Sequence, residues 1–204
     1  MIYCWTSAFP VDTWYTFFSP FTGNAGLYQA ENGLTFCLPC LTGKFQNEIG
    51  KPSCKECPAG YSNGGTKAKE CAKCGRGRFG EQRGQADCKV CLVGYYSEEV
   101  GLVSRNECTE CPAGKYSPTP GAKLRSSCTD CQLGKYGTEE GQASSETGCS
   151  DCAVDQFRPS KEVVNGIDTP TDPTMCVDCP AGEYQNDKGQ ASWWVIYCTN
   201  SLTF

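Results

Sequence analysis

The residues of this chain most able to do chemistry are its eighteen cysteines, sixteen of which form eight Cys-x-x-Cys pairs. Such pairs can ligate zinc, exchange thiols with disulfides, or supply the two halves of structural disulfides. The first cysteines of successive pairs are 17 to 27 residues apart, which makes them an internal repeat. The pairs are Cys37/Cys40, Cys54/Cys57, Cys71/Cys74, Cys88/Cys91, Cys108/Cys111, Cys128/Cys131, Cys149/Cys152 and Cys176/Cys179, whereas Cys4 and Cys198 stand alone.

Zinc is the strongest alternative to disulfides, because Cys37-x2-Cys40-x13-Cys54-x2-Cys57 matches the spacing of a four-cysteine zinc site. The same spacing, however, continues through eight pairs of an acidic chain, and no basic helix follows that could bind DNA. A redox role is also disfavoured, since no βαβ pattern surrounds any pair. We therefore expect structural disulfides, no bound metal and no cofactor.

A local pairing scheme accounts for every cysteine, although connectivity cannot be deduced from sequence alone. In this scheme the second cysteine of each pair joins the first cysteine of the next pair. Loops of about 15 residues would make each bond worth roughly 3 kcal/mol. The expected bonds are Cys40–Cys54, Cys57–Cys71, Cys74–Cys88, Cys91–Cys108, Cys111–Cys128, Cys131–Cys149 and Cys152–Cys176, with Cys4–Cys37 and Cys179–Cys198 at the ends.

Composition explains why covalent links are needed. Aliphatic residues are sparse in the 204-residue chain, which has 23 glycines, so each short segment buries too little surface to offset its ordering entropy. Disulfides persist in oxidising compartments, so we expect a secreted protein with an extracellular or cell-surface location. No secretory signal or apolar run of membrane-span length is visible, which suggests a mature segment or a fragment. A net charge of -5 argues against nucleic acid and anionic membranes as partners.

The residues after each pair repeat as Cys-x-x-Gly-x-aromatic, for example CLTGKF from Cys40. In Cys57-Pro58-Ala59-Gly60, the proline and glycine favour a type I turn over these four residues. A short strand would follow, and a second glycine such as Gly84 would return the chain toward the next cysteine. The pattern predicts a small disulfide-rich, mainly β fold with little helix, built as an extended rod of tandem two-stranded hairpins.

The seventh unit departs from this pattern. Asp155 replaces the turn glycine, and the insertion KEVVNGIDTPTDPTM precedes Cys176. Its prolines predict a surface loop. Asp168 and Asp172 in this insertion are weak candidates for calcium, because no EF-hand or calcium-binding EGF signature accompanies them, and a solvated loop is favoured.

Three segments are expected. Residues 1–36 form an aromatic-rich N-terminal cap or assembly segment, residues 37–179 the tandem repeats, and residues 180–204 the last repeat with an aromatic C-terminal segment. Ten of the 23 aromatic residues precede Cys37. They could simply cap the repeats, but so many exposed aromatics also indicate an interaction surface. The candidate assembly residues are Trp5, Trp14, Phe17, Phe18, Trp193 and Trp194.

The CPAGYS step at Cys57 and the CPAGKYS step at Cys111, each followed by a glycine and the next pair, resemble the ephrin-receptor-like cysteine-rich repeat. Tumour-necrosis-factor-receptor and EGF-like modules are more distant in style. The resemblance covers about residues 36–184 and implies an extended extracellular rod of stacked hairpins. Such repeats occur in receptors, adhesion proteins and large surface proteins of unicellular eukaryotes, so the resemblance says little about role.

Catalysis has little support, because the absence of histidine removes the usual general base and nucleophile partners. The carboxylates of Glu98–Glu99 and Glu139–Glu140 are expected to be solvated, and we predict that the chain is not an enzyme. No Asn-x-Ser/Thr sequon occurs, so a glycoprotein would carry O-linked glycans. The candidate acceptors are Ser117, Thr119, Thr169 and Thr171.

Two functions fit these features. The preferred one is a non-enzymatic structural protein, a repeat subunit of an extracellular filament or surface coat that self-associates through its aromatic ends. Other extracellular proteins or glycans are possible further partners. The alternative is the stalk or ligand-binding region of a receptor or adhesion ectodomain.

Overall fold

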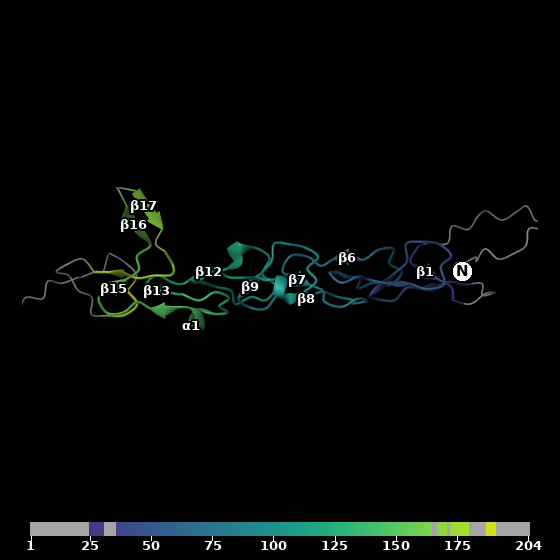
Figure 1. Ribbon diagram of the computed structural model, residues 1–204, viewed down its shortest axis with the longest axis horizontal. Coiled ribbons are helices and arrows are strands. Elements are labelled where there is room, and N and C mark those ends of the chain that lie inside the picture. Colours follow the sequence, from purple (N-terminus) through teal and green to yellow (C-terminus); the bar gives the residue numbers. More distant parts are fainter. Residues whose placement is uncertain (1–24, 31–35, 165–166, 171, 180–186, 191–204) are drawn as a thin grey trace, which may run out of the picture. The chain divides into compact units, whose positions relative to one another are not determined.

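The computed structural model describes residues 25–30, 36–164, 167–170, 172–179 and 187–190 (Figure 1). Within these residues it is a series of two-stranded antiparallel hairpins with three short helical turns. The predicted mainly β, disulfide-stapled fold with little helix is confirmed. All six candidate assembly residues lie outside the described residues.

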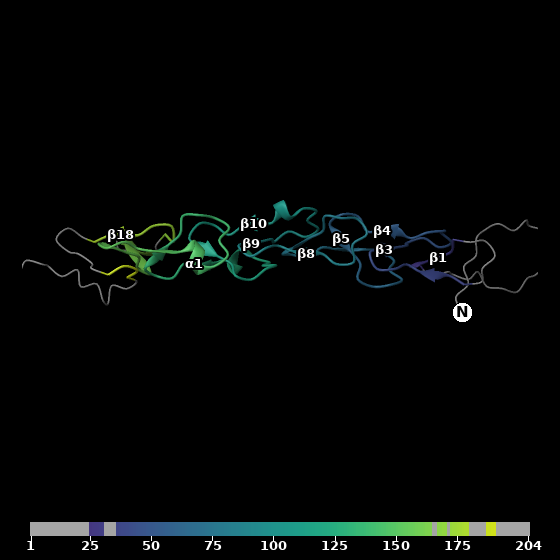
Figure 2. The same ribbon diagram turned by 90° about the horizontal axis from the view of Figure 1, so that it is seen from below.

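Each hairpin joins two short strands, and within each unit the hairpins follow the order of the sequence (Figure 2). The pairs are β1 (Leu27–Tyr28) with β2 (Leu38–Pro39), β3 (Lys44–Phe45) with β4 (Lys55–Glu56), β5 (Tyr61–Ser62) with β6 (Ala72–Lys73), β7 (Arg78–Phe79) with β8 (Lys89–Val90), β9 (Tyr95–Tyr96) with β10 (Thr109–Glu110), β11 (Lys115–Tyr116) with β12 (Thr129–Asp130), β13 (Lys135–Tyr136) with β14 (Ser150–Asp151), β15 (Gln156–Phe157) with β18 (Val177–Asp178), and β16 (Lys161–Val164) with β17 (Ile167–Pro170). The helical turns are Arg105–Glu107, Arg125–Ser127 and α1 (Ser145–Gly148).

The chain forms two compact units. Unit 1 contains the described residues up to Lys89 together with Glu99–Glu107, and unit 2 contains Val90–Glu98 and the described residues from Cys108 onward. The extended rod concerns the shape of the whole chain and stays a prediction, which small-angle scattering would test.

The Cys-x-x-Cys spacing follows from the hairpin geometry. The two residues between the cysteines of a pair form the second strand of the hairpin, as Lys55–Glu56 does opposite Lys44–Phe45. Residues three apart in a strand point to opposite faces, so the two cysteines of a pair cannot both form disulfides on the same side of the hairpin. Cys54 therefore closes the hairpin behind it, and Cys57 begins the next one.

Half-cystines form most of the buried core. The second cysteine of each pair from Cys40 to Cys152 is buried. Few other apolar side chains of the described residues join them, among them Leu27, Phe79 and Leu102. The disulfides thus occupy the place that aliphatic side chains take in larger domains.

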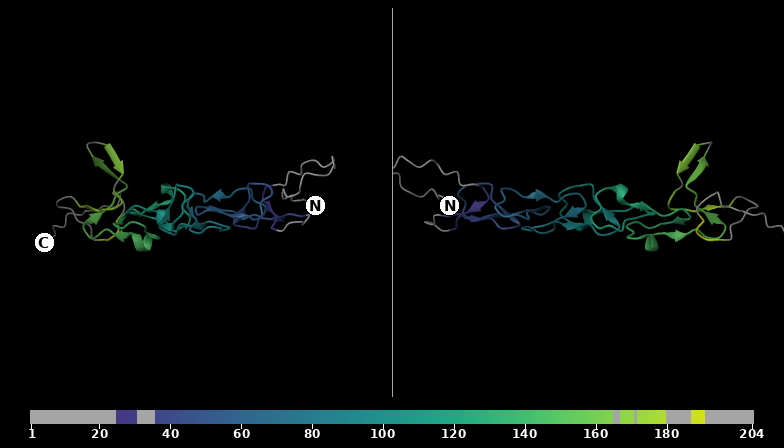
Figure 3. Two further views of the ribbon diagram at one scale, coloured as in Figure 1. Left: turned by 45° about the vertical axis from the view of Figure 1, so that its right-hand side comes forward. Right: turned by 180° about the vertical axis from the view of Figure 1, so that it is seen from behind.

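The insertion before Cys176, which was predicted to be a surface loop, contains a regular β-hairpin. Residues Lys161–Val164 and Ile167–Pro170 pair as the hairpin β16–β17, which projects from the other hairpins of unit 2 (Figure 3). Val164 lies opposite Ile167, which leaves Asn165 and Gly166 between the strands in the sequence. An Asn-Gly step between β-branched residues is typical of a two-residue hairpin turn, and this signal was overlooked beside the prolines.

Candidate binding surface

The seven local disulfides expected from the repeat spacing are all present. Each joins the second cysteine of one pair to the first cysteine of the next, across 14 to 24 residues of sequence. The bonds are Cys40–Cys54, Cys57–Cys71, Cys74–Cys88, Cys91–Cys108, Cys111–Cys128, Cys131–Cys149 and Cys152–Cys176. Each loop between two pairs is therefore closed covalently.

The two terminal bonds have different outcomes. Cys37 is disulfide-bonded, but Cys4 lies outside the described residues, so the bond between these two cysteines stays a prediction. Cys179 is a free thiol, which corrects the expected bond to Cys198. Each of the seven local bonds ends at the first cysteine of a further pair, whereas Cys198 belongs to no pair, so no repeat spacing places it beside Cys179.

The turn after each pair lies one residue later than predicted and is of another type. The amide of Tyr61 donates to the carbonyl of Pro58 at 3.1 Å, and Gly60 between them has a φ of +79°. A positive φ at the third position defines a type II turn, not the expected type I turn. Asp155 occupies the same position in the seventh unit with a φ of +64°, so the turn survives without glycine there.

Successive repeats are joined by backbone hydrogen bonds. At the junction after Cys40, the amide of Gly43 donates to Asn63 at 2.7 Å and that of Gln46 to Ala68 at 3.0 Å. The amide of Lys67 donates back to the carbonyl of Cys40 at 2.9 Å. Because these bonds use backbone groups alone, they leave the exposed side chains free to differ between repeats.

One polar position is buried at these junctions. The residue after the motif aromatic, or its equivalent, is Gln29, Gln46, Ser97, Ser117 or Arg158, and each is buried. Ser117 is 0% exposed, so it cannot accept a glycan, which removes it from the O-glycosylation candidates. Thr119 is exposed and stays a candidate. The side chain of Thr169 and all of Thr171 lie outside the description, so both acceptors stay predictions.

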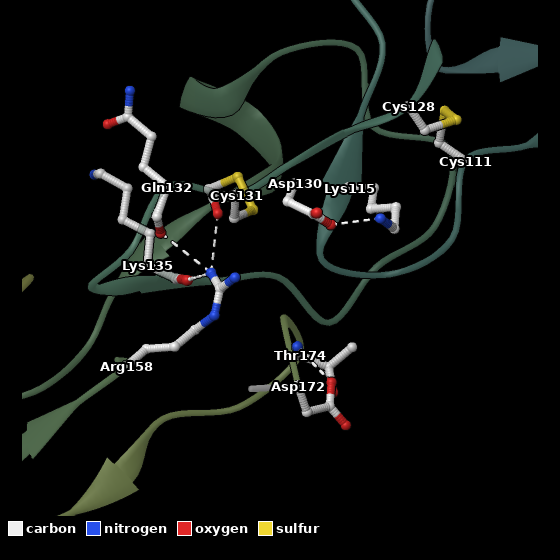
Figure 4. Close-up of polar contacts among 11 residues, drawn as sticks. Cys111, Lys115, Cys128, Asp130, Cys131, Gln132, Lys135, Arg158, Asp172 and Thr174 are labelled. Carbon is white, nitrogen blue, oxygen red and sulfur yellow. Dashed lines mark hydrogen bonds and ion pairs between the residues drawn. A yellow bond between two sulfur atoms is a disulfide. The ribbon is translucent and has the colours of Figure 1, made fainter. Parts of the chain in front are cut away.

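Arg158 is the unusual member of this buried set (Figure 4). Only 4% of the residue is exposed, and its Nη1 atom donates to the carbonyl oxygens of Cys131 at 3.0 Å and Gln132 at 3.1 Å. A third donation goes to the carbonyl of Lys135. The guanidinium therefore ties the residue that follows β15 to the preceding turn of the same unit. Sequence reasoning missed this residue, because a lone arginine after an aromatic has no recognisable pattern.

Burial lowers the pKa of the Arg158 guanidinium from its usual value, and the charges of Asp130 and Asp172 oppose that shift. Asp172 accepts hydrogen bonds from the backbone amide and the hydroxyl of Thr174, which lower the pKa of its carboxyl. Asp172 is thus occupied in a local turn. No group of three potential metal ligands occurs among the residues that the structure describes. The side chain of Asp168 lies outside the description.

Cross-strand polar pairs line most hairpins. The residue after the turn glycine lies opposite the residue before the second cysteine, and in five hairpins a donor faces a carboxylate. Lys135 and Asp151, for example, form an ion pair at 2.7 Å. The other pairs are Lys44 with Glu56, Tyr95 with Glu110, Lys115 with Asp130, and Gln156 with Asp178. Exposed pairs of this kind stabilise a fold only weakly, so they mainly set the surface charge.

Residues 66–89 of unit 1 depart from this pattern of cross-strand carboxylates. This stretch, called here the basic segment, carries seven Lys or Arg residues against three Asp or Glu residues. Lys73 lies opposite Tyr61 where most other hairpins have a carboxylate. The basic segment is the part of the described surface most distinct from the common repeat.

Comparison with known proteins agrees with the architecture. Residues 26–74 and 77–128 each match the family model described as tyrosine-protein kinase ephrin type A/B receptor-like. No curated protein matches the chain. No helix among the described residues is both long and apolar enough to cross a membrane.

Proposed function

Because the chain carries tandem repeats of the ephrin type A/B receptor-like family, we propose that it is a region of an extracellular receptor or adhesion ectodomain. In this role the repeats form a disulfide-stapled spacer that presents exposed side chains to other extracellular molecules. The family match favours this role over that of a filament subunit.

The repeated junction is the observation that carries this proposal. The amides of Gly84 and Gly141 donate to the carbonyls of Cys57 and Cys111, both at 2.8 Å, as Lys67 does to Cys40. The same backbone connection thus recurs in both units while the exposed residues change. A spacer needs this combination, because its length depends on repeat number and its specificity depends on exposed side chains.

A non-catalytic role is part of the proposal. The cross-strand carboxylates are exposed to solvent and paired with lysine, tyrosine or glutamine, so none of them lies in a water-excluded site. Glu48, a carboxylate outside the strands, has its pKa lowered to about 2 by Lys51 and Lys55. A general acid or base at neutral pH needs a pKa shifted toward 7 instead.

Deletion of one whole repeat tests the spacer function. Removing residues 111–130 joins Glu110 to Cys131, which restores a Cys-x-x-Cys pair and removes Cys111 and Cys128 together. Behind a secretory leader and before a membrane anchor, this variant should reach the surface of eukaryotic cells. It should carry the same number of alkylatable thiols as the parent, because each remaining bond keeps its own loop.

The control is a deletion out of phase. Removing residues 111–127 leaves Cys128 without Cys111, so this variant should show an extra thiol or be retained in the cell. The spacer proposal would be contradicted if both deletions gained thiols equally, or if both variants were retained in the cell to the same extent.

Filament or coat assembly through the aromatic ends is a second and finer proposal. It is supported by the concentration of aromatics before Cys37 and near Trp193 and Trp194 in the sequence. Large aromatics at an interface centre commonly dominate its binding energy.

Electron microscopy of purified chain tests this second function. Trp193→Ser with Trp194→Ser should abolish filaments, while the control Leu92→Ser with Val93→Ser, which alters two exposed apolar residues of a repeat, should retain them. Filaments that survive the tryptophan changes and vanish in the control would assign assembly to the repeat flanks.

A further inference from the structure

The basic segment carries cations at two repeat positions where other repeats carry carboxylates. The first position precedes the second cysteine of a pair. It is Glu56, Glu110, Asp130, Asp151 or Asp178 in five hairpins, whereas the basic segment has Lys73 there. Since the backbone of this hairpin matches the others, the change is one of surface chemistry alone.

The second position is the turn that docks on the preceding repeat. In other repeats this turn contains Glu48, Glu99, Glu139 with Glu140, or Asp187 shortly before its glycine. In the basic segment, Arg83 precedes Gly84, and Lys67 itself occupies the turn with a φ of +61°. Successive repeats therefore present a cation from equivalent turns.

Five cations of the basic segment are available for a ligand. They are exposed, and none makes an ion pair or side-chain hydrogen bond with any residue that the structure describes; they are Lys67, Lys69, Lys73, Arg76 and Arg83. Two neighbours are engaged instead, because Lys89 pairs with Glu81 at 2.7 Å and Arg78 donates to the carbonyl of Cys88.

The backbone that carries these cations is already ordered. Cys57–Cys71 and Cys74–Cys88 close its two loops, and the amides of Lys67 and Gly84 are bound to cysteine carbonyls of the preceding repeat. Binding would therefore order only the long side chains, because the backbone is already fixed. The smaller loss of conformational entropy favours binding.

The composition of the basic segment selects the kind of ligand. Its only large apolar side chain is that of Phe79, and this residue is 4% exposed. Protein interfaces usually need exposed aromatic or aliphatic anchors, which are missing here. A flexible polyanion needs none, because it binds through charge-assisted hydrogen bonds from Arg and Lys to its anionic groups.

We propose that the basic segment binds a sulfated polysaccharide. This inference rests on the extracellular placement proposed above and adds a ligand class to it. Sulfate groups recur along such a polymer, as the cations of Lys67 and Arg83 recur at equivalent turns of adjacent repeats. Arginine and lysine both bind sulfate oxygens, arginine through two parallel N–H donors.

Binding to heparin, used as the sulfated probe, tests the inference by surface plasmon resonance at physiological salt. The triple variant Lys69→Ser, Lys73→Ser, Arg76→Ser should bind about tenfold more weakly or worse. The matched control Lys123→Ser, Arg125→Ser, Lys188→Ser removes three exposed charges from unit 2 and should bind like the parent. A charge-keeping variant, Lys69→Arg, Lys73→Arg, Arg76→Lys, should also retain binding.

Three outcomes would overturn the inference. They are unchanged affinity of the first triple variant, equal losses in the first triple variant and its unit 2 control, and competition by polyglutamate at the same concentration as heparin. The last result would identify an acidic protein as the better ligand. The repeat deletion described above leaves the basic segment intact, so failure of heparin binding and failure of the spacer proposal are distinguishable.

Discussion

The Nη1 atom of Arg158 lies 3.0 Å from the carbonyl oxygen of Cys131, where other repeats place a backbone amide. At the equivalent positions, Gly84 donates to Cys57 and Gly141 donates to Cys111. The hairpin β16–β17 is inserted where the corresponding turn of the seventh unit would lie. The guanidinium of Arg158 thus supplies the donor that the insertion displaced, and it satisfies the Gln132 carbonyl as well.

Arg158→Met should loosen this junction. The change removes the side-chain donor of the Cys131 and Lys135 carbonyls, while the Gln132 carbonyl keeps the Lys135 amide, for a loss of about 2 kcal/mol locally. Amide hydrogen exchange should therefore quicken about 30-fold at Gly134, which donates to the Arg158 carbonyl, and at Cys152, which donates to Gly134. Arg83→Met, at an exposed arginine, is the control and should change neither amide. Unchanged protection at Gly134 in Arg158→Met would show that the insertion is held by other contacts.

Gly94→Ala should destabilise unit 2. An added Cβ would lie 2.1 Å from the carbonyl oxygen of Gly141, and the φ of +81° adds about 1–2 kcal/mol of strain. We expect faster exchange of the Gly141 amide, which donates to Cys111, and easier proteolysis of unit 2. Gly75→Ala is the matched control, because a Cβ there meets no atom within 4 Å. Equal behaviour of the two variants would contradict the close approach between repeats.

Native alkylation should distinguish the cysteines at the end of the repeats. Iodoacetamide without reductant is expected to modify Cys179, because its thiol is free and partly exposed. Peptide mapping should find Cys111 linked to Cys128, with neither one modified. A peptide that links Cys179 to Cys198 would instead restore the nine-bond scheme expected from the sequence.

Glu48 should titrate near pH 2. Lys51 Nζ lies 2.8 Å and Lys55 Nζ 2.7 Å from its carboxylate oxygens, which lowers the pKa from its usual 4.5 to about 2. The folded-state pKa is depressed, so the small stabilisation is present above pH 4.5 and is lost as the pH falls toward 2. NMR titration of the side-chain carboxyl should show this midpoint, and Lys55→Met should raise it.

Lys69→Met is the control for this titration and should leave the Glu48 midpoint in place, since Lys69 makes no ion pair with a described residue. Salt should also raise the midpoint, because the side chain of Glu48 is 46% exposed and its partners are screened. A midpoint near 4.5 in the parent chain would show that these ion pairs do not persist in solution.

The sequence by itself determined the repeat, the fold class and seven disulfides. The spacing favours local bonds, and the structure contains them: a two-residue strand between the cysteines of a pair directs them to opposite faces, so Cys54 bonds to Cys40 and Cys57 bonds to Cys71. The predicted bond between Cys179 and Cys198 was wrong. The repeat ends at Cys179, and no further Cys-x-x-Cys pair follows to place a partner beside it. The predicted turn was also one residue early and of the wrong type, because the Cys-Pro-Ala-Gly pattern does not say whether glycine takes the third position, with a positive φ, or the fourth.

Only the tertiary structure decided which side chains are buried and which are free. Ser117 looked like an exposed acceptor beside prolines, yet contact between repeats covers it completely. Arg158 carries no recognisable sequence signal, yet its guanidinium is buried and donates to the Cys131 carbonyl, which in other repeats accepts a turn amide. Both depend on contacts between residues of different repeats, and local sequence does not encode these because the junctions are built from backbone groups that every repeat shares.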